Sequence, residues 1–326
     1  MKKLKLAGSC CLLAFAMTGG PAVAETAPKD LVDALNGVFG QHAGKRASHA
    51  KGICAAGEFR PTGEAAQLSK APHFAGEAVP VTIRFSMGGG KPAIPDKTNV
   101  TRGMAIRFAL PDESFTDLVT ISAPVFFART PEDALQFLLV RKADPATGKP
   151  DAAKVEEFSK AHPETTLQGA WLKAHPVPNS YLTTPFFAVN AFKFTNDGGQ
   201  SVYGRWYIEP AGGVVGLTEE EVNSVSDDFL TEDLEKRLAA GAADFQVHVQ
   251  LAGAGDPITD PTVEWPATRE RVHVGTISVH KVTGQDCDGN MYNPLALPAG
   301  IEPSDDPILA IRPAVYVESL LRRQQK

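Results

Sequence analysis

The amino-acid sequence predicts an α+β protein in which an antiparallel sheet or barrel is surrounded by helices. Three observations lead to this class. Short apolar stretches recur along the chain, helical patterns lie between and after them, and the Gly/Pro-rich stretches that separate them are short enough to be loops. A chain of 326 residues with 43% hydrophobic and 21% charged residues can bury a large core. The Gly/Pro-rich stretches are too short to be linkers between domains and no internal repeat is present, so we expect one domain rather than two.

The spacing of apolar residues, every second residue in strands and every third or fourth in helices, places the elements along the chain. Ile83 and Phe85 alternate with polar neighbours, so Arg84 is expected on the opposite face of a strand. The predicted strands cover residues 79–85, 103–110, 115–121, 125–128, 186–194, 202–209, 245–251 and 272–281. The predicted helices cover residues 27–38, 131–142, 152–161 and 218–240, with a last one from residue 307 towards the C-terminus.

The N-terminus has the pattern of an export signal. Three lysines precede an apolar run over residues 6–17, a Gly-Gly-Pro break follows, and Ala22-Val23-Ala24 matches a signal cleavage site. The apolar run is too short for a helix that spans a bilayer. We therefore expect a cleaved signal over residues 1–24, with cleavage between Ala24 and Glu25. A single domain over residues 25–326 would then reside in the periplasm or outside the cell, with no membrane attachment.

Charge and cysteine content narrow the possible partners. The net charge is −6 and no Lys/Arg-rich run is present, so no nucleic-acid partner is expected. Cleavage of the signal removes Cys10 and Cys11 and leaves Cys54 and Cys287. In an oxidising compartment these two could form a disulfide, but the sequence does not establish that they lie close together, and the alternative is two free thiols.

The last predicted helix carries a distinctive set of polar side chains. Arg312, Tyr316 and Arg323 are spaced so that they share one helical face. A neighbouring cation favours the ionised form of a phenol. A phenolate is a hard anionic ligand for ferric iron. The alternative interpretation is an ordinary polar helix surface.

The motifs around this helix extend the interpretation. The segment NPLALPAGIEPS at 293–304, followed by RPAVY at 312–316 and Arg323, resembles the proximal haem segment of haem catalases. Upstream, RASHAKG at 46–52 resembles the distal segment of that family. VTIRFS at 81–86, RGMAIRF at 102–108 and PVFFAR at 124–129 are similar to further family motifs. These matches occur in the family's order and cover nearly all of the chain after the signal.

The resemblance implies a catalase-like antiparallel β-barrel core with surrounding helices and a haem b cofactor, iron protoporphyrin IX. Tyr316 would be the iron ligand, kept ionised by Arg312. Three guanidiniums would pair with the two haem propionates, a task that suits their planar geometry. The residues implied in cofactor binding are Arg46, Arg84, Phe126, Arg312 and Arg323.

The same resemblance makes His49 the distal base. A neutral imidazole can take a proton from peroxide and return it to the departing oxygen, so that water leaves. The other seven histidines are expected to be packed or surface residues.

Two departures from the family pattern point to a subgroup. Ile121 stands where catalases have a distal Asn, and an isobutyl group offers no hydrogen bond to peroxide. Ser122 could compensate through a water, or could simply end a strand. The sequence also stops shortly after Tyr316, so we expect the C-terminal helical domain of full-length catalases to be lacking. Both features resemble the small catalase-related peroxidases.

The predicted function is therefore reduction of hydrogen peroxide or organic hydroperoxides with a small organic electron donor, and weak catalase activity. Two alternatives remain open: an isomerising enzyme of fatty-acid hydroperoxides, and a non-enzymatic haem-carrying barrel. The protein is expected to be a monomer or a homodimer.

Overall fold

The structure of the protein is a computed structural model, and it describes residues 25–325. The predicted export signal lies outside these residues. Ten strands form one antiparallel sheet: β1 (Gly52–Pro61), β2 (Val79–Met87), β3 (Arg102–Ala109), β4 (Phe115–Ile121), β5 (Phe186–Phe187), β6 (Phe192–Thr195), β7 (Ser201–Pro210), β8 (Ala243–Leu251), β9 (Arg271–Gly284) and β10 (Ile301–Pro303).

Eight of these strands close into a barrel. The ring runs β7-β5-β4-β3-β2-β1-β9-β8 and returns to β7 through the β7–β8 pairing. Strands β6 and β10 extend from β7 outside the ring. The predicted antiparallel β-barrel core is therefore confirmed.

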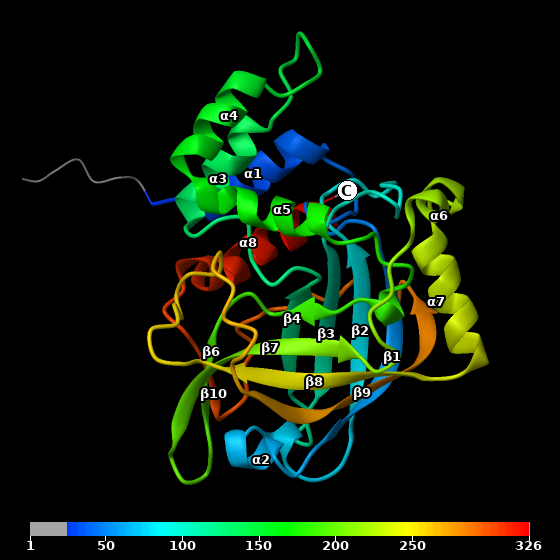
Figure 1. Ribbon diagram of the computed structural model, residues 1–326, viewed down its shortest axis with the longest axis vertical. Helices are drawn as coiled ribbons and strands as arrows, with labels where there is room; N and C mark the ends of the chain where they lie inside the picture. Colours follow the sequence, from blue (N-terminus) through cyan, green and yellow to red (C-terminus); the bar gives the residue numbers. More distant parts are fainter. Residues whose placement is uncertain (1–24, 326) are drawn as a thin grey trace, which may run out of the picture.

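Helices cover the barrel on several sides (Figure 1). They are α1 (Pro28–Phe39), α2 (Ala65–Leu68), α3 (Pro131–Val140), α4 (Ala152–Ala161), α5 (Leu167–Ala174), α6 (Glu219–Ser224), α7 (Phe229–Ala240) and α8 (Pro307–Gln324), with short 3₁₀ turns at Pro72–Phe74, Pro163–Thr166 and Tyr181–Thr183. Helix α1 packs against α3 and α8, and α3 also contacts α8. The last helix therefore lies against both α1 and α3. Within residues 25–325, no helix combines the length and the apolarity that a membrane span requires.

The inside of the barrel is filled by one side of each strand. Phe59, Phe85, Phe108, Phe186 and Phe245 point inwards and are at most 2% exposed. The predicted alternation is confirmed in β2, where Ile83 and Phe85 belong to this core and Arg84 lies on the outer face.

The outer face of β1 to β4 carries a row of paired residues. Cys54 lies opposite Arg84, Arg84 opposite Ala105, and Ala105 opposite Val119. Arg84 is nevertheless buried, so other parts of the chain cover this outer face. The functional residues described below gather here.

Two predicted strands are wrong in part. Residues 125–128 form no strand, because Phe126 and Phe127 pack against a cluster of helix residues instead of joining a ladder. The predicted strand 186–194 is broken into β5 and β6, and the buried Asn190 lies in the break. A polar side chain inside an apolar run marks this interruption.

Further elements differ from the sequence prediction, among them the short α2 and β10, which were not predicted. Strand β1 was not predicted, because its Ala-Ala-Gly centre lacks β-branched residues; its pairing partners β2 and β9 impose the extended form. The predicted helix 218–240 ends at Ser224 and restarts at Phe229. Helix α5 was also not predicted, and it holds no buried residue that would give a clear apolar face.

Cys54 and Cys287 form a disulfide, which resolves the question that the sequence left open. The bond joins residues 233 positions apart in sequence and attaches the loop after β9 to strand β1. Both cysteines are buried beside Tyr292, on the outer face of the barrel.

Loss of this disulfide is expected to destabilise the fold. Replacing both cysteines, Cys54→Ser with Cys287→Ser, should lower the free energy of unfolding by about 2–5 kcal/mol, because a long loop is no longer closed in the unfolded chain. Guanidinium denaturation of the oxidised wild type and of the double variant measures this difference. An unchanged midpoint would show that the bond adds no stability.

Candidate functional site

Helix α8 carries the first part of the site. The carboxylate of Asp306 caps the helix by accepting from the backbone N–H groups of Ile308 and Leu309 at 2.9 and 3.3 Å. One turn apart on this helix, Arg312 Nε donates to the hydroxyl of Tyr316 at 3.0 Å. The predicted alignment of these two side chains is confirmed.

Two residues that the sequence analysis missed hold Arg312 in place. Arg312 Nη1 donates to Asn190 Oδ1 at 2.6 Å, and Asn190 Nδ2 donates to Asp306 Oδ2 at 2.7 Å. Asn190 and Asp306 are both 1% exposed. This buried chain fixes the guanidinium that contacts Tyr316. Its only sequence signal was the amide inside an apolar run.

A cluster of guanidiniums forms the second part of the site. We call Arg46, Arg84 and Arg323 the arginine cluster. Arg46 and Arg84 both pair with Asp288 Oδ1, at 3.1 and 2.9 Å. Arg46 and Arg323 both donate to the backbone carbonyl of Asn290, at 2.8 and 3.3 Å. The structure thus brings together all three arginines that the sequence assigned to one task.

The positive charge of the arginine cluster exceeds the negative charge that is paired with it. Its ion pairs within residues 25–325 all go to the single carboxylate of Asp288. Burial and the charges of Arg84 and Arg323 lower the pKa of Arg46 to about 9, although Asp288 opposes this shift. Burial also lowers the pKa of Arg323. The excess of two positive charges suits a ligand with two carboxylates.

His49 forms the third part of the site, in the segment between α1 and β1. Its Nδ1 and the hydroxyl of Ser86 lie 3.0 Å apart, which leaves Nε2 available to a ligand. The backbone of His49 is left-handed, with φ 55°, a costly conformation for a residue with a side chain. Arg84 Nη1 donates to the His49 carbonyl at 3.0 Å and so helps to hold it.

The side chains of His49 and Ser86 approach the backbone of β3 closely, which explains why residue 103 is a glycine. A Cβ atom at this position would lie 2.8 Å from His49 Nδ1 and 2.6 Å from Ser86 Oγ. The imidazole therefore packs directly on the backbone of β3, and a larger residue would push it away.

Burial, together with neighbouring positive charges, favours the neutral form of His49. Burial lowers its pKa to about 4, and the charges of Arg84, Arg312 and Arg46 act in the same direction. The segment that carries His49 also contacts helix α8, because the backbone N–H of Ala47 donates to Ser319 Oγ at 3.2 Å. Residues from opposite ends of the chain therefore meet here.

The remaining predicted positions lie around this site. Ile121 ends β4, is partly buried and pairs with Gly103. The Ser122 hydroxyl accepts from the backbone N–H of Arg102 at 2.8 Å, so it serves the strand end. Phe126 packs with Phe127 beside a cluster that includes residues of α8.

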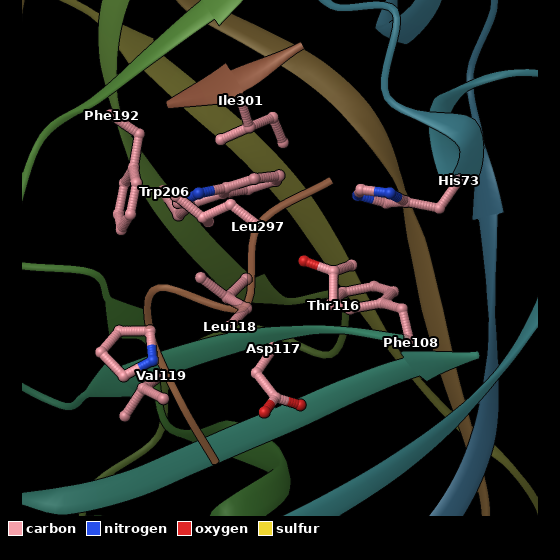
Figure 2. Close-up of a pocket in the computed structure, with 11 residues that line it drawn as sticks. His73, Phe108, Thr116, Asp117, Leu118, Val119, Phe192, Trp206, Leu297 and Ile301 are labelled. Atoms are coloured by element: carbon pink, nitrogen blue, oxygen red, sulfur yellow. The ribbon is translucent and has the colours of Figure 1, made fainter. Parts of the chain in front are cut away.

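A separate pocket lies at another part of the barrel (Figure 2). His73 and Phe108 line one side of it and Phe192 the other, with Trp206 and Leu297 between them. Burial lowers the pKa of His73 to about 3, so this histidine is neutral. The pocket is mainly apolar and contains no counterpart of the arginine cluster. His73 is thus a packed histidine, as the sequence predicted.

One further group of side chains has the chemistry of metal ligands. His162 Nδ1 lies 3.4 Å from Asp133 and 3.5 Å from Glu164, and all three side chains are partly buried. These contacts connect α3 to the turn after α4, which accounts for them without a metal.

The sequence is similar to those of catalases and catalase-related peroxidases. A family model described as catalase matches residues 20–325. A catalase-related peroxidase of Synechococcus elongatus is 37% identical over 94% of this chain and 91% of its own length. A catalase-related peroxidase of Mycolicibacterium paratuberculosis is 35% identical over 91% of this chain and 94% of its own.

The solved structures agree at the level of the fold. Catalase A of Saccharomyces cerevisiae superposes with a TM-score of 0.78 at 23% identity. The match covers 97% of this chain and 68% of that longer one. At this identity the likeness concerns the fold alone.

Proposed function

Because this chain belongs to the catalase family, we propose that it is a haem-dependent peroxidase that reduces hydrogen peroxide or organic hydroperoxides with a small organic electron donor. The observation that carries the proposal is the convergence of Tyr316, Arg312 and His49 with an arginine cluster that has two positive charges in excess.

The residues fit haem b. Tyr316 would hold the iron, with Arg312 donating to its oxygen, and the arginine cluster would hold the two propionates. Phe126 would contact the macrocycle. When bound, haem supplies the redox chemistry that takes up the oxidising equivalents of peroxide and passes them to the donor.

The chain's own contribution to peroxide cleavage is proton transfer by His49. Neutral imidazole accepts a proton at Nε2 from the peroxide, while Ser86 holds Nδ1. The imidazolium then returns this proton to the departing oxygen, so water rather than hydroxide leaves. The left-handed backbone of His49 and its contact with Gly103 keep the ring in place during both steps.

Ile121 favours peroxidase over catalase turnover. A second peroxide would find no amide at this position, and the hydroxyl of Ser122 is engaged with β3. We therefore expect weak oxygen evolution and efficient oxidation of an organic donor.

The experiment that tests this function combines two measurements. The absorption spectrum of the purified protein reports the cofactor, and oxygen release against dye oxidation after addition of peroxide separates catalase from peroxidase turnover. A lipid hydroperoxide without reductant tests for isomerisation through its products. A holoprotein that only bleaches with peroxide would be a haem carrier, and the peroxidase proposal would then fall.

The rate of the peroxide reaction should depend on pH through His49. The neutral ring is the active base, so kcat/KM for peroxide should be constant above pH about 5 and fall about tenfold per pH unit below pH about 4. A pH profile with the organic donor at saturation measures this. A decline that begins near pH 6.5 would show that the burial and charges around His49 do not control its protonation.

We further propose that the chain is exported, that residues 1–24 are removed between Ala24 and Glu25, and that residues 25–326 form one catalase-like domain in the periplasm or outside the cell. The Cys54–Cys287 disulfide supports an oxidising location. Size-exclusion chromatography with light scattering would distinguish the expected monomer or homodimer from larger assemblies.

A further inference from the structure

A short path of bonds leads from the disulfide to Arg84. Cys287 is bonded to Cys54, and Cys54 lies directly opposite Arg84 in the β1–β2 register. The next residue in the loop, Asp288, accepts from Arg84 Nε at 2.9 Å. Gln285 Nε2 also donates to the Gly52 carbonyl at 3.0 Å, so the loop is attached to β1 at two points.

Arg84 continues the path to the distal histidine. Its Nη1 donates to the His49 carbonyl at 3.0 Å, and its Nη2 approaches the Ala50 carbonyl at 3.4 Å. The guanidinium reaches these atoms across Gly52, where a Cβ atom would lie 2.6 Å from Arg84 Cζ. Arg84 therefore holds the backbone at the residue that adopts φ 55°.

We propose that Asp288, attached to β1 by the Cys54–Cys287 disulfide, is a positioning residue that holds the His49 imidazole in place through Arg84. This inference rests on the proposed function of His49 as the base. Asp288 touches neither the imidazole nor the reacting atoms, so its effect passes through the guanidinium.

Charge explains why a carboxylate is needed at this position. In the haem-free protein, loss of Asp288 would leave the guanidiniums of Arg46 and Arg84 to repel each other at close range, and in the haem-loaded protein Arg84 Nε would still lose the oxygen that accepts from it. Arg84 would then be free to turn away from the His49 carbonyl. Burial opposes the ionisation of Asp288, but hydrogen bonding to Arg84 and the charges of Arg84 and Arg46 outweigh it and lower the pKa of Asp288.

The disulfide fixes the position of the Asp288 carboxylate. Asp288 lies in a loop rather than in a strand or helix, and Cys287 immediately before it is 1% exposed. Breaking the bond leaves the loop attached mainly through side-chain contacts. Asp288 and the disulfide should therefore act as one unit on His49.

The test is a cycle of four haem-loaded proteins: wild type, Asp288→Asn, the Cys54→Ser/Cys287→Ser double variant, and the combination of all three substitutions. The rate of cyanide association reports the position of His49, because hydrogen cyanide must give its proton to the distal base before it binds. We expect each change alone to slow association about tenfold, and the combination to be no slower than either alone. Asp286→Asn, at an exposed position of the same loop, is the matched control and should bind cyanide as the wild type does.

Hydrogen exchange of residues 46–51 in the haem-free proteins provides a measurement that does not depend on the cofactor. Exchange should be faster in Asp288→Asn and in the cysteine double variant than in wild type or Asp286→Asn. If the cysteine variant does not fold, wild type treated with a phosphine reductant replaces it.

The outcomes separate this inference from the proposed function. Unchanged cyanide association and unchanged exchange in Asp288→Asn would overturn the positioning role, even if the wild type is an active peroxidase. Additive effects of Asp288→Asn and the cysteine variant would overturn the claim that the two act as one unit. A wild type that takes up no haem would contradict the proposed function, while the exchange measurement would still decide whether Asp288 holds the His49 backbone.

Discussion

A Tyr316→Phe protein is expected to lose its haem or to hold it with a changed ligand. The substitution removes one oxygen atom, the one that accepts from Arg312 Nε at 3.0 Å. Removing a residue that merely supports a metal ligand costs about 10–100-fold in affinity, so removing the ligand itself should cost more. The Arg312 guanidinium would also face a ring with no acceptor. Haem content after gel filtration and the Soret and charge-transfer bands measure both effects.

The matched control is Tyr203→Phe in strand β7, which makes the same chemical change at a partly buried tyrosine of the barrel wall. It should retain haem and activity. If Tyr316→Phe bound haem with an unchanged spectrum, Tyr316 would not be the iron ligand.

Replacement of His49 is expected to have the second large effect. In His49→Gln, the rate constant for the reaction with peroxide should fall by about 10²–10⁴, the usual contribution of a general acid–base residue. Haem content should change little, because Tyr316 and the arginine cluster remain. Gln keeps hydrogen-bonding atoms near Ser86 but cannot carry the proton. Stopped-flow mixing with peroxide measures the rate.

His42→Gln tests whether the effect belongs to this one histidine. His42 lies seven residues earlier in the same segment, is exposed, and has its Nε2 3.1 Å from the Phe39 carbonyl. This variant should react with peroxide as the wild type does. An unchanged rate in His49→Gln would require another proton acceptor in the site.

The barrel and the contact between Arg312 and Tyr316 could be predicted because both leave local patterns in the sequence. Strand β2 alternates between apolar and polar residues from Val81 to Ser86, and the spacing of Arg312 and Tyr316 on a helix places them in contact. The arginine cluster was found through ordered motifs. Its members come from three distant segments that no periodicity relates.

The supporting residues could not be predicted, because their roles depend on tertiary contacts. Asp288 lies in a polar, Gly-containing loop and looks like an ordinary turn residue until Arg46 and Arg84 are placed beside it. Ser86 lies near the end of β2 and gains its role only from the imidazole of His49, which the fold places beside it. Strand β1 was missed for a similar reason, since its neighbours β2 and β9 determine its conformation.

The pairing of β1 with β9 has a consequence for how the protein folds. This pairing joins residues 54–61 to residues 275–284, so the ring can close only when nearly the whole chain is available. His49 precedes the first of these strands and Tyr316 follows the last. A growing chain therefore has no means of assembling both sides of the site, and an incomplete product should take up no haem. Reactive chemistry is thereby reserved for finished molecules.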